Sequence, residues 1–119
     1  MKPVAWIGSR YRDFRAFPDL VQDTMGFALY LARVGQRHGS AKPLKGLGGA
    51  GVLEIVEDHQ GDTWRAVYTV RFDNTVYVSH VFQEKARKGI KTPQEEIEGV
   101  RRRLRIAEQE HEARGRGVS

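Results

Sequence analysis

The chain has 119 residues, a formal net charge of +5, a pI near 9.8 and no cysteine. This length fits one domain with a real core, and 39% hydrophobic against 29% charged residues excludes a disordered chain. The missing cysteines exclude a disulfide framework and a thiolate zinc site. Membrane helices need apolar runs of roughly 20 residues, and the sequence has none; its start also lacks a signal-peptide pattern. We expect one cytoplasmic domain over residues 1–119, with about 110–119 as a flexible tail.

The first part of the chain predicts a short strand and two helices. Residues 4–7 fit a strand, Ser9 can cap a short helix that continues to about Ala16, and Pro18 suits the first turn of a second helix. Apolar residues of that second helix recur at helical spacing, namely Val21, Met25, Ala28 and Ala32. Gly35 suits the C′ position that ends it. The two helices should form a hairpin with one apolar side.

The middle of the chain predicts a Gly-rich loop and then three antiparallel strands. The loop covers residues 35–51, and the strands are expected over residues 52–57, 63–72 and 75–82. One parity of the second strand is apolar throughout: Trp64, Ala66, Tyr68, Val70 and Phe72. We expect that face of the sheet to pack on the helices and Arg65 to lie on the opposite face.

A third helix is predicted near the end of the chain. Thr92 is a good N-cap, Pro93 suits position N1, and Glu95 completes a capping box. One apolar stripe follows, formed by Ile97, Val100, Leu104 and Ala107. From about Glu110 the sequence is charged and contains glycine, so we expect it to fray.

Positive charge is concentrated in two segments. Residues 24–53 contain four Lys or Arg and no acidic residue, and residues 85–91 contain four more, again without an acid. Such patches attract polyanions over a Debye length of about 8 Å at physiological salt. Nucleic acid is the first candidate for the polyanion, and an acidic protein partner is the second.

The order of strand, helix hairpin, three-stranded meander and final helix resembles the RelE/ParE toxin superfamily. The motifs are most similar to those of the phage-derived HigB-like (Tad-type) toxins. The matching segments are residues 42–48 (KPLKGLG), 52–55 (VLEI), 62–68 (DTWRAVY), 76–82 (VYVSHVF) and 88–93 (KGIKTP). The resemblance implies an α+β, RelE-like fold. It also implies a type II toxin that cleaves translated mRNA on the ribosome, with a cognate helix-turn-helix antitoxin as partner.

Metal-free RNA cleavage uses the 2′-hydroxyl as nucleophile and needs a base, an acid and cations for the developing charge. The sequence offers no convincing His pair, so we predict a catalytic site of Arg65, Lys85 and Lys45, with no metal or other cofactor. A neighbouring cation lowers a lysine pKa and makes a neutral base available. Arg65 could instead form a salt bridge to Glu54 or Glu57, and Lys45 could be an ordinary loop lysine.

Further RNA contacts are predicted for Lys88, Arg87, Phe82 and Lys42. Lys88 and Arg87 could equally belong to a solvated linker. Phe82 could stack on a base or pack in the core, and Lys42 could be ordinary surface. We expect His80 to be a packed histidine.

Glu84 departs from the family pattern, which usually has two adjacent lysines at this point; Lys85 is the second of them. If the first lysine is catalytic, cleavage is weakened or lost; if it only binds phosphate, the cations that follow compensate. Two alternatives stay open, the first because the fold alone does not exclude it and the second because of Glu84. One is a toxin of the same fold that poisons DNA gyrase without cleaving RNA. The other is a non-catalytic relic that still binds its antitoxin.

Overall fold

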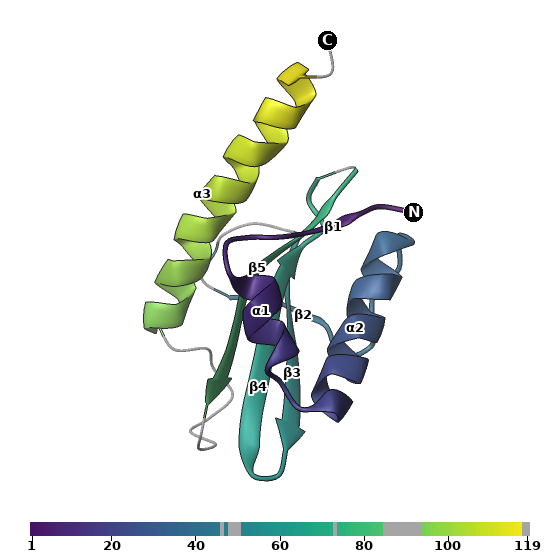
Figure 1. The fold of residues 1–119 in the computed structure, drawn as a ribbon, viewed down its shortest axis with the longest axis vertical. Helices are drawn as coiled ribbons and strands as arrows, with labels where there is room; N and C mark the ends of the chain where they lie inside the picture. The colour runs from purple at the N-terminus through teal and green to yellow at the C-terminus, as the bar shows by residue number, and fades with distance from the viewer. Residues whose placement is uncertain (46, 48–50, 73, 85–93, 118–119) are drawn as a thin grey trace.

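The computed structural model describes residues 1–45, 47, 51–72, 74–84 and 94–117 of the chain (Figure 1). Its elements are β1 (Val4–Trp6), α1 (Arg10–Arg15), α2 (Asp19–Arg33), β2 (Lys42–Pro43), β3 (Val52–His59), β4 (Asp62–Thr69), β5 (Val76–Glu84) and α3 (Gln94–Gly117). The predicted α+β fold is confirmed, including the first strand, the helical hairpin, the meander and the final helix.

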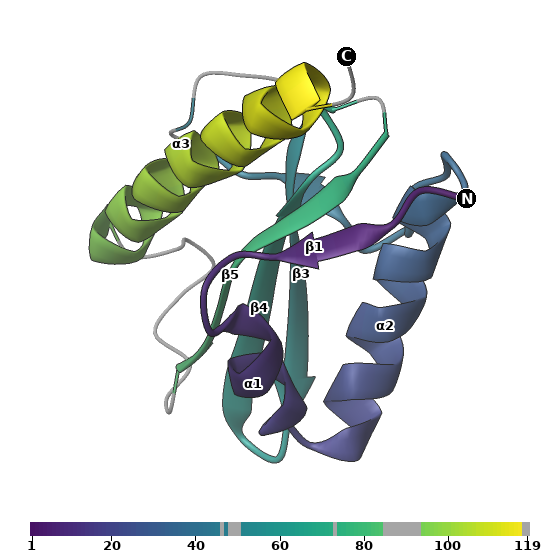
Figure 2. The same cartoon turned by 45° about the horizontal axis from the view of Figure 1, so that its top comes forward.

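The strands form one sheet in the order β1-β5-β4-β3-β2. β1 runs parallel to β5 (Figure 2), and the other pairs are antiparallel. The β3–β4 turn is tight because Gln60 and Gly61 both have positive φ, at 52° and 88°, as expected for a hairpin turn whose twist matches its strands. Both strands therefore extend closer to the turn than the sequence predicted. At its other end β4 stops at Thr69 and not at Phe72, so the alternation ends there, and Phe72 packs with Tyr77 and Ala107 on the α3 side of the sheet instead of the predicted side.

β2 lies within the segment predicted to be a loop. It pairs Lys42 with Glu54 and Pro43 with Leu53 at the sheet edge. Two residues are too few to show an alternating pattern, so sequence periodicity could not reveal this strand. Proline is tolerated there because an edge strand leaves one side of its backbone without a ladder partner.

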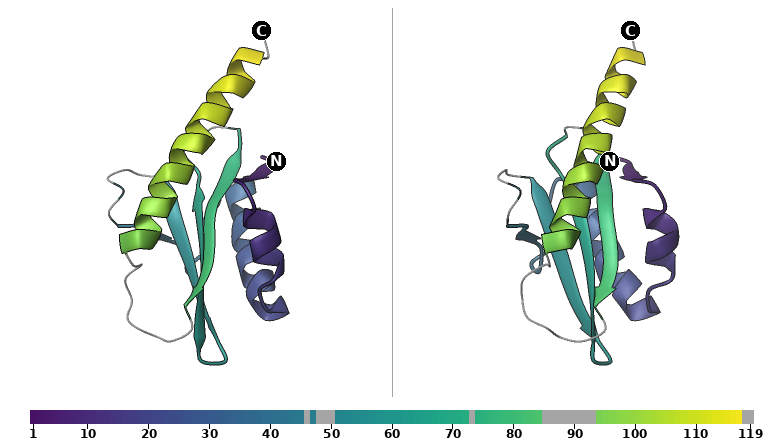
Figure 3. Two further views of the ribbon diagram at one scale, coloured as in Figure 1. Left: turned by 60° about the vertical axis from the view of Figure 1, so that its left-hand side comes forward. Right: turned by 90° about the vertical axis from the view of Figure 1, so that its left-hand side faces the viewer.

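α1 and α2 cover one face of the sheet (Figure 3). The predicted stripe of α2 is buried there, against apolar residues of the meander such as Leu53, Ile55, Ala66 and Tyr68. α2 ends as predicted: Gly35 has a φ of +82°, and its N–H donates to the carbonyl of Ala32. The α1 start differs from the prediction, because the Ser9 hydroxyl bonds Asp13 Oδ2 instead of a backbone N–H.

α3 covers the opposite face of the sheet, so the sheet lies between two helical layers (Figure 3). Its predicted stripe is buried: Val100 and Leu104 pack with Val67, and Ala107 packs with Tyr77. This face is the one that carries Arg65. The sequence placed Arg65 on the correct face but did not predict that a helix covers this face.

The C-terminal helix is longer than expected. It continues to Gly117, whereas the sequence predicted fraying from about Glu110. His111 explains part of this extension, because its ring packs 4.5 Å from the Phe72 ring. Thr92 and Pro93, the predicted helix start, lie outside the described residues. Among the residues that are described, no helix has both the length and the apolar character needed to cross a bilayer.

Truncating Leu104 should show how strongly α3 is held. Leu104→Ala removes a side chain that is only 9% exposed, and should lower the free energy of unfolding by about 2–5 kcal/mol. Ile106→Ala, on the same helix but 42% exposed, is the matched control and should change it by less than about 1 kcal/mol. Urea denaturation followed by circular dichroism measures both. Equal effects would mean that α3 does not pack on the sheet as described.

Candidate functional site

Arg65 lies at the centre of β4 and is buried, with 1% of its surface exposed. Its Nε donates a 2.7 Å hydrogen bond to Glu84 Oε1, and its Nη1 donates a 3.3 Å bond to Glu54 Oε2. The predicted alternative, a salt bridge from Arg65 to Glu54, is therefore confirmed. Glu57 points to the other face of the sheet, since it alternates with Glu54 and Val56 along β3.

The sheet register explains why two carboxylates reach one guanidinium. Arg65 is directly opposite Val56 on β3 and Phe82 on β5. Glu54 lies two residues before Val56 and Glu84 two residues after Phe82, so both are diagonal neighbours of Arg65 on the same face. Diagonal neighbours lie about 7–8 Å apart at Cα, a span that long side chains bridge easily.

The other predicted site residues lie at different depths. Lys42 and Lys45 are exposed, and Lys42 is directly opposite Glu54, so it shares the face of Arg65. Phe82 is half-buried and its ring lies 5.2 Å from that of His80. The structure thus groups Lys42 and Phe82 with the Arg65 face.

Lys85, Arg87 and Lys88, the cations predicted to act on RNA after the last strand, lie outside the described residues. Their placement relative to Arg65 therefore remains a prediction from the sequence.

A second polar cluster forms where α3 meets β5, and sequence reasoning missed it. His80 is bonded on both ring nitrogens, by Glu96 at Nε2 and by Arg103 Nη1 at Nδ1. Since the guanidinium can only donate, Nδ1 must accept, and the ring proton is on Nε2. This is the neutral form of histidine. His80 is packed, as the sequence predicted, but it also joins two elements.

Burial is the main cause of a lowered pKa at His80; Arg103 and Arg10 lower it further, and Glu96 opposes them. Gly99 lies between Glu96 and Arg103 on the helix, and a Cβ there would be 3.8 Å from the His80 ring and 3.1 Å from Arg103 Nη1. Glycine therefore leaves room for these side chains. The seven-residue spacing of Glu96 and Arg103 was a usable signal, but the sequence did not show which strand faced them.

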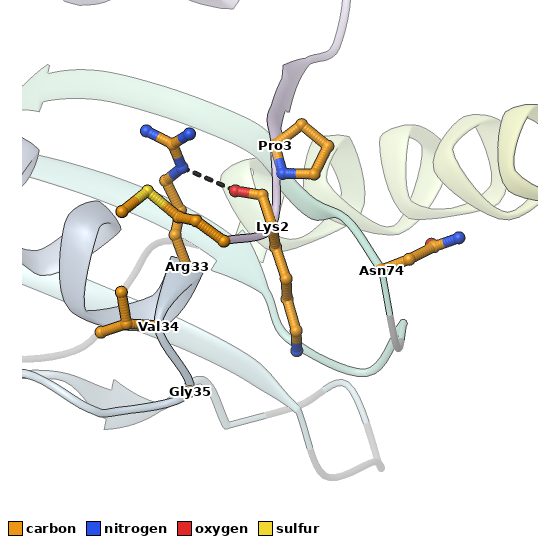
Figure 4. Close-up of a pocket in the computed structure, with 7 residues that line it drawn as sticks. Lys2, Pro3, Arg33, Val34, Gly35 and Asn74 are labelled. Carbon is orange, nitrogen blue, oxygen red and sulfur yellow. Dashed lines mark hydrogen bonds between the residues drawn. The ribbon is translucent and has the colours of Figure 1, made fainter.

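Other features of the described residues offer less. No group of three or more His or carboxylate side chains is placed to hold a metal ion within that part of the chain. A shallow hollow lies between the N-terminal segment and the end of α2 (Figure 4). Arg33 Nε donates there to the Lys2 carbonyl at 2.6 Å, so this arginine supports the chain start. None of the residues predicted for catalysis lines it.

Arg65→Ala should destabilise the protein and not only remove a side chain proposed for catalysis. It removes the guanidinium from two mostly buried carboxylates, which should lower the free energy of unfolding by about 3–5 kcal/mol. Replacing all three charges, as Arg65→Met with Glu54→Gln and Glu84→Gln, should restore most of this loss, because no charge is then left behind. Urea unfolding of both variants measures this. A stable Arg65→Ala protein would contradict the structural role of the ion pairs.

Acidification should weaken the protein through His80. Its folded pKa is below the unfolded value of about 6.5, so the unfolded state binds more protons as the pH falls. The stabilisation is complete above about pH 6.5 and is lost as the pH falls through the folded pKa. His80→Gln should flatten the pH dependence of unfolding between about pH 7.5 and 5, and His59→Gln is the control. An unchanged pH slope in His80→Gln would contradict this assignment.

Comparison with known proteins identifies the family. The family model described as "Phage derived protein Gp49-like (DUF891)" matches residues 12–105. Among solved structures, the isolated E. coli RelE toxin in its P21 crystal form is similar over 86% of this chain and 98% of that chain. Its TM-score is 0.53 and its sequence identity 19%. At this identity the likeness establishes the fold alone. No curated protein sequence matches the chain.

The RelE-like fold that the motif resemblance implied is thus confirmed, and the HigB-like (Tad-type) grouping stays a prediction. Since the family model covers the chain from α1 into α3, this protein belongs to the phage-derived Gp49-like family and has a RelE-like fold.

Proposed function

We propose that the protein is the toxin of a type II toxin–antitoxin system, a metal-independent endoribonuclease that cleaves translated mRNA on the ribosome. The observation that supports this most is the Gp49-like family match over residues 12–105 together with the RelE-like fold. Within the superfamily, the motif order favours the HigB-like (Tad-type) group. The net charge of +5 suits a protein that binds RNA.

In this proposal, Arg65, Lys45 and Lys85 form the catalytic site. Arginine holds phosphate in a bidentate fork, and a lysine next to other cations can serve as a neutral base. Lys88, Arg87, Phe82 and Lys42 bind the RNA. The exposure of Lys42, which lies on the Arg65 face, and the exposure of Lys45 support these roles.

The proposed partners are a helix-turn-helix antitoxin, the ribosome and its mRNA, with the cytoplasm as the place of action. The chain's basic segments would suit an acidic antitoxin as well as RNA. Both would compete for the same positive surface, which is a simple way to neutralise a toxin.

A second candidate function is antitoxin binding without cleavage. It is favoured by one observation, the engagement of Arg65 by two carboxylates in place of a free guanidinium surface. A protein that keeps the fold and the basic surface could still bind its antitoxin while the RNA site is closed.

The test is a translation reaction programmed with one mRNA, with new 5′ ends mapped by primer extension in the presence and absence of ribosomes. Cuts should appear only in translated mRNA. Lys45→Ala should reduce them at least about tenfold, because it removes a cation that stabilises the transition state. Lys2→Ala, a lysine at the hollow near the N-terminus, is the control and should cleave normally.

Two outcomes would contradict the nuclease. Intact mRNA with folded protein and tight antitoxin binding would favour the non-catalytic candidate. Intact mRNA with gyrase-dependent DNA damage would favour the gyrase toxin.

A further inference from the structure

We propose that the Glu84 carboxylate competes with the RNA phosphate for Arg65, so that RNA reaches the guanidinium only after Glu84 has left it. This inference rests on the proposed function, because it describes how the same site is kept closed. It makes Glu84 a built-in brake on RNA binding.

The Arg65 guanidinium is almost inaccessible from solvent. Only 1% of the residue is exposed, and its Nε and Nη1 both donate to carboxylate oxygens. A phosphate bound in a bidentate fork uses the same kind of guanidinium donors. Phosphate contact therefore requires at least one carboxylate to move.

The carboxylates of the cluster are more exposed than the guanidinium. The side chains of Glu54 and Glu84 are 11% and 14% exposed, against 1% for Arg65. Solvent at this cluster thus meets the carboxylates before the guanidinium. Exposed Lys42, opposite Glu54, can attract a phosphate to this face, but at Arg65 itself the phosphate must compete with two carboxylates that are already bound.

Glu84 is the carboxylate that is free to move, because the two glutamates differ in their place in the sheet. Glu54 lies within β3, between β2 and β4, and pairs with both strands. Glu84 is the last residue of β5, where the described ladder continues only toward β4, through Thr63. A side chain at a strand end can change rotamer with less disturbance to packing than one between two paired strands. Glu54 would stay and keep the buried Arg65 charge balanced.

Glu84→Gln tests this directly. Glutamine keeps the shape and can still accept from Arg65, but it removes the negative charge that competes with phosphate. The variant should bind a short, non-cleavable 2′-O-methyl RNA about five- to tenfold more tightly than the wild type, as expected when a charge-assisted hydrogen bond is replaced by a neutral one. Fluorescence anisotropy with labelled RNA measures the dissociation constants, and thermal melts confirm folding.

Two further variants make the result specific. Glu57→Gln changes the net charge equally but on the other face of the sheet, and should change affinity less than about twofold. Combining Glu84→Gln with Arg65→Met and Glu54→Gln, the set that leaves no buried charge behind, should abolish the gain, because the phosphate then has no guanidinium to reach. A gain in Glu84→Gln that matches Glu57→Gln, or that survives in the triple variant, would overturn the proposal.

The outcome is separable from that of the nuclease assay. If wild-type protein cleaves translated mRNA but Glu84→Gln binds RNA no more tightly, the nuclease stands and the brake is wrong. If Glu84→Gln binds more tightly and neither protein cleaves, the brake stands and the nuclease is wrong.

Discussion

A guanidinium at the centre of a sheet can be buried only when negative charge is buried with it, because an isolated charge in the interior loses several kcal/mol of hydration. Arg65 satisfies this condition through Glu54 on one neighbouring strand and Glu84 on the other. The three residues join the strands of the meander across their diagonals. The ion pairs of this one side chain therefore help to fix the alignment of β3, β4 and β5.

The covering helix depends on the same face of the sheet. α3 buries Val100 and Leu104 against the apolar part of that face, next to Val67, two residues from Arg65. His80 then connects β5 to α3 through Glu96 and Arg103. The face thus has an apolar region held by packing and a polar region held by ion pairs and a neutral histidine. Loss of either region should loosen the helix.

The contacts of Arg65 conflict with the function proposed for it. The proposed RNA cleavage needs cations that can touch phosphate. The structure instead gives Arg65 two carboxylate partners. Either the site opens when RNA arrives, with Glu84 as the group displaced, or the chain binds its partner without cutting RNA. RNA affinity and cleavage, measured separately, distinguish these possibilities.

The sequence predicted the order of the elements and one buried side of each. Alternation in residues 64–70 and the helical stripes of α2 and α3 predicted the side chains on those sides, because periods of 2 and 3.6 residues are local properties. The burial of Arg65, Val67 and Thr69 on the other face of β4 was not predicted. The sequence also placed Arg65 on the face opposite α1 and α2, and it included Glu54 among the possible partners. It missed β2, which is too short to have a period.

The contacts of Arg65 and His80 could be seen only once the fold was known. The pairing of Arg65 with Glu84 depends on the alignment of β4 with β5, which shifts by one residue at the irregularity between Val67 and Tyr68. The contact of His80 with α3 depends on how a helix docks onto a strand. Both are relations between segments distant in the chain, and no local pattern encodes them. The periodicity of a strand shows which way a side chain points, whereas its environment is set by the elements packed against it.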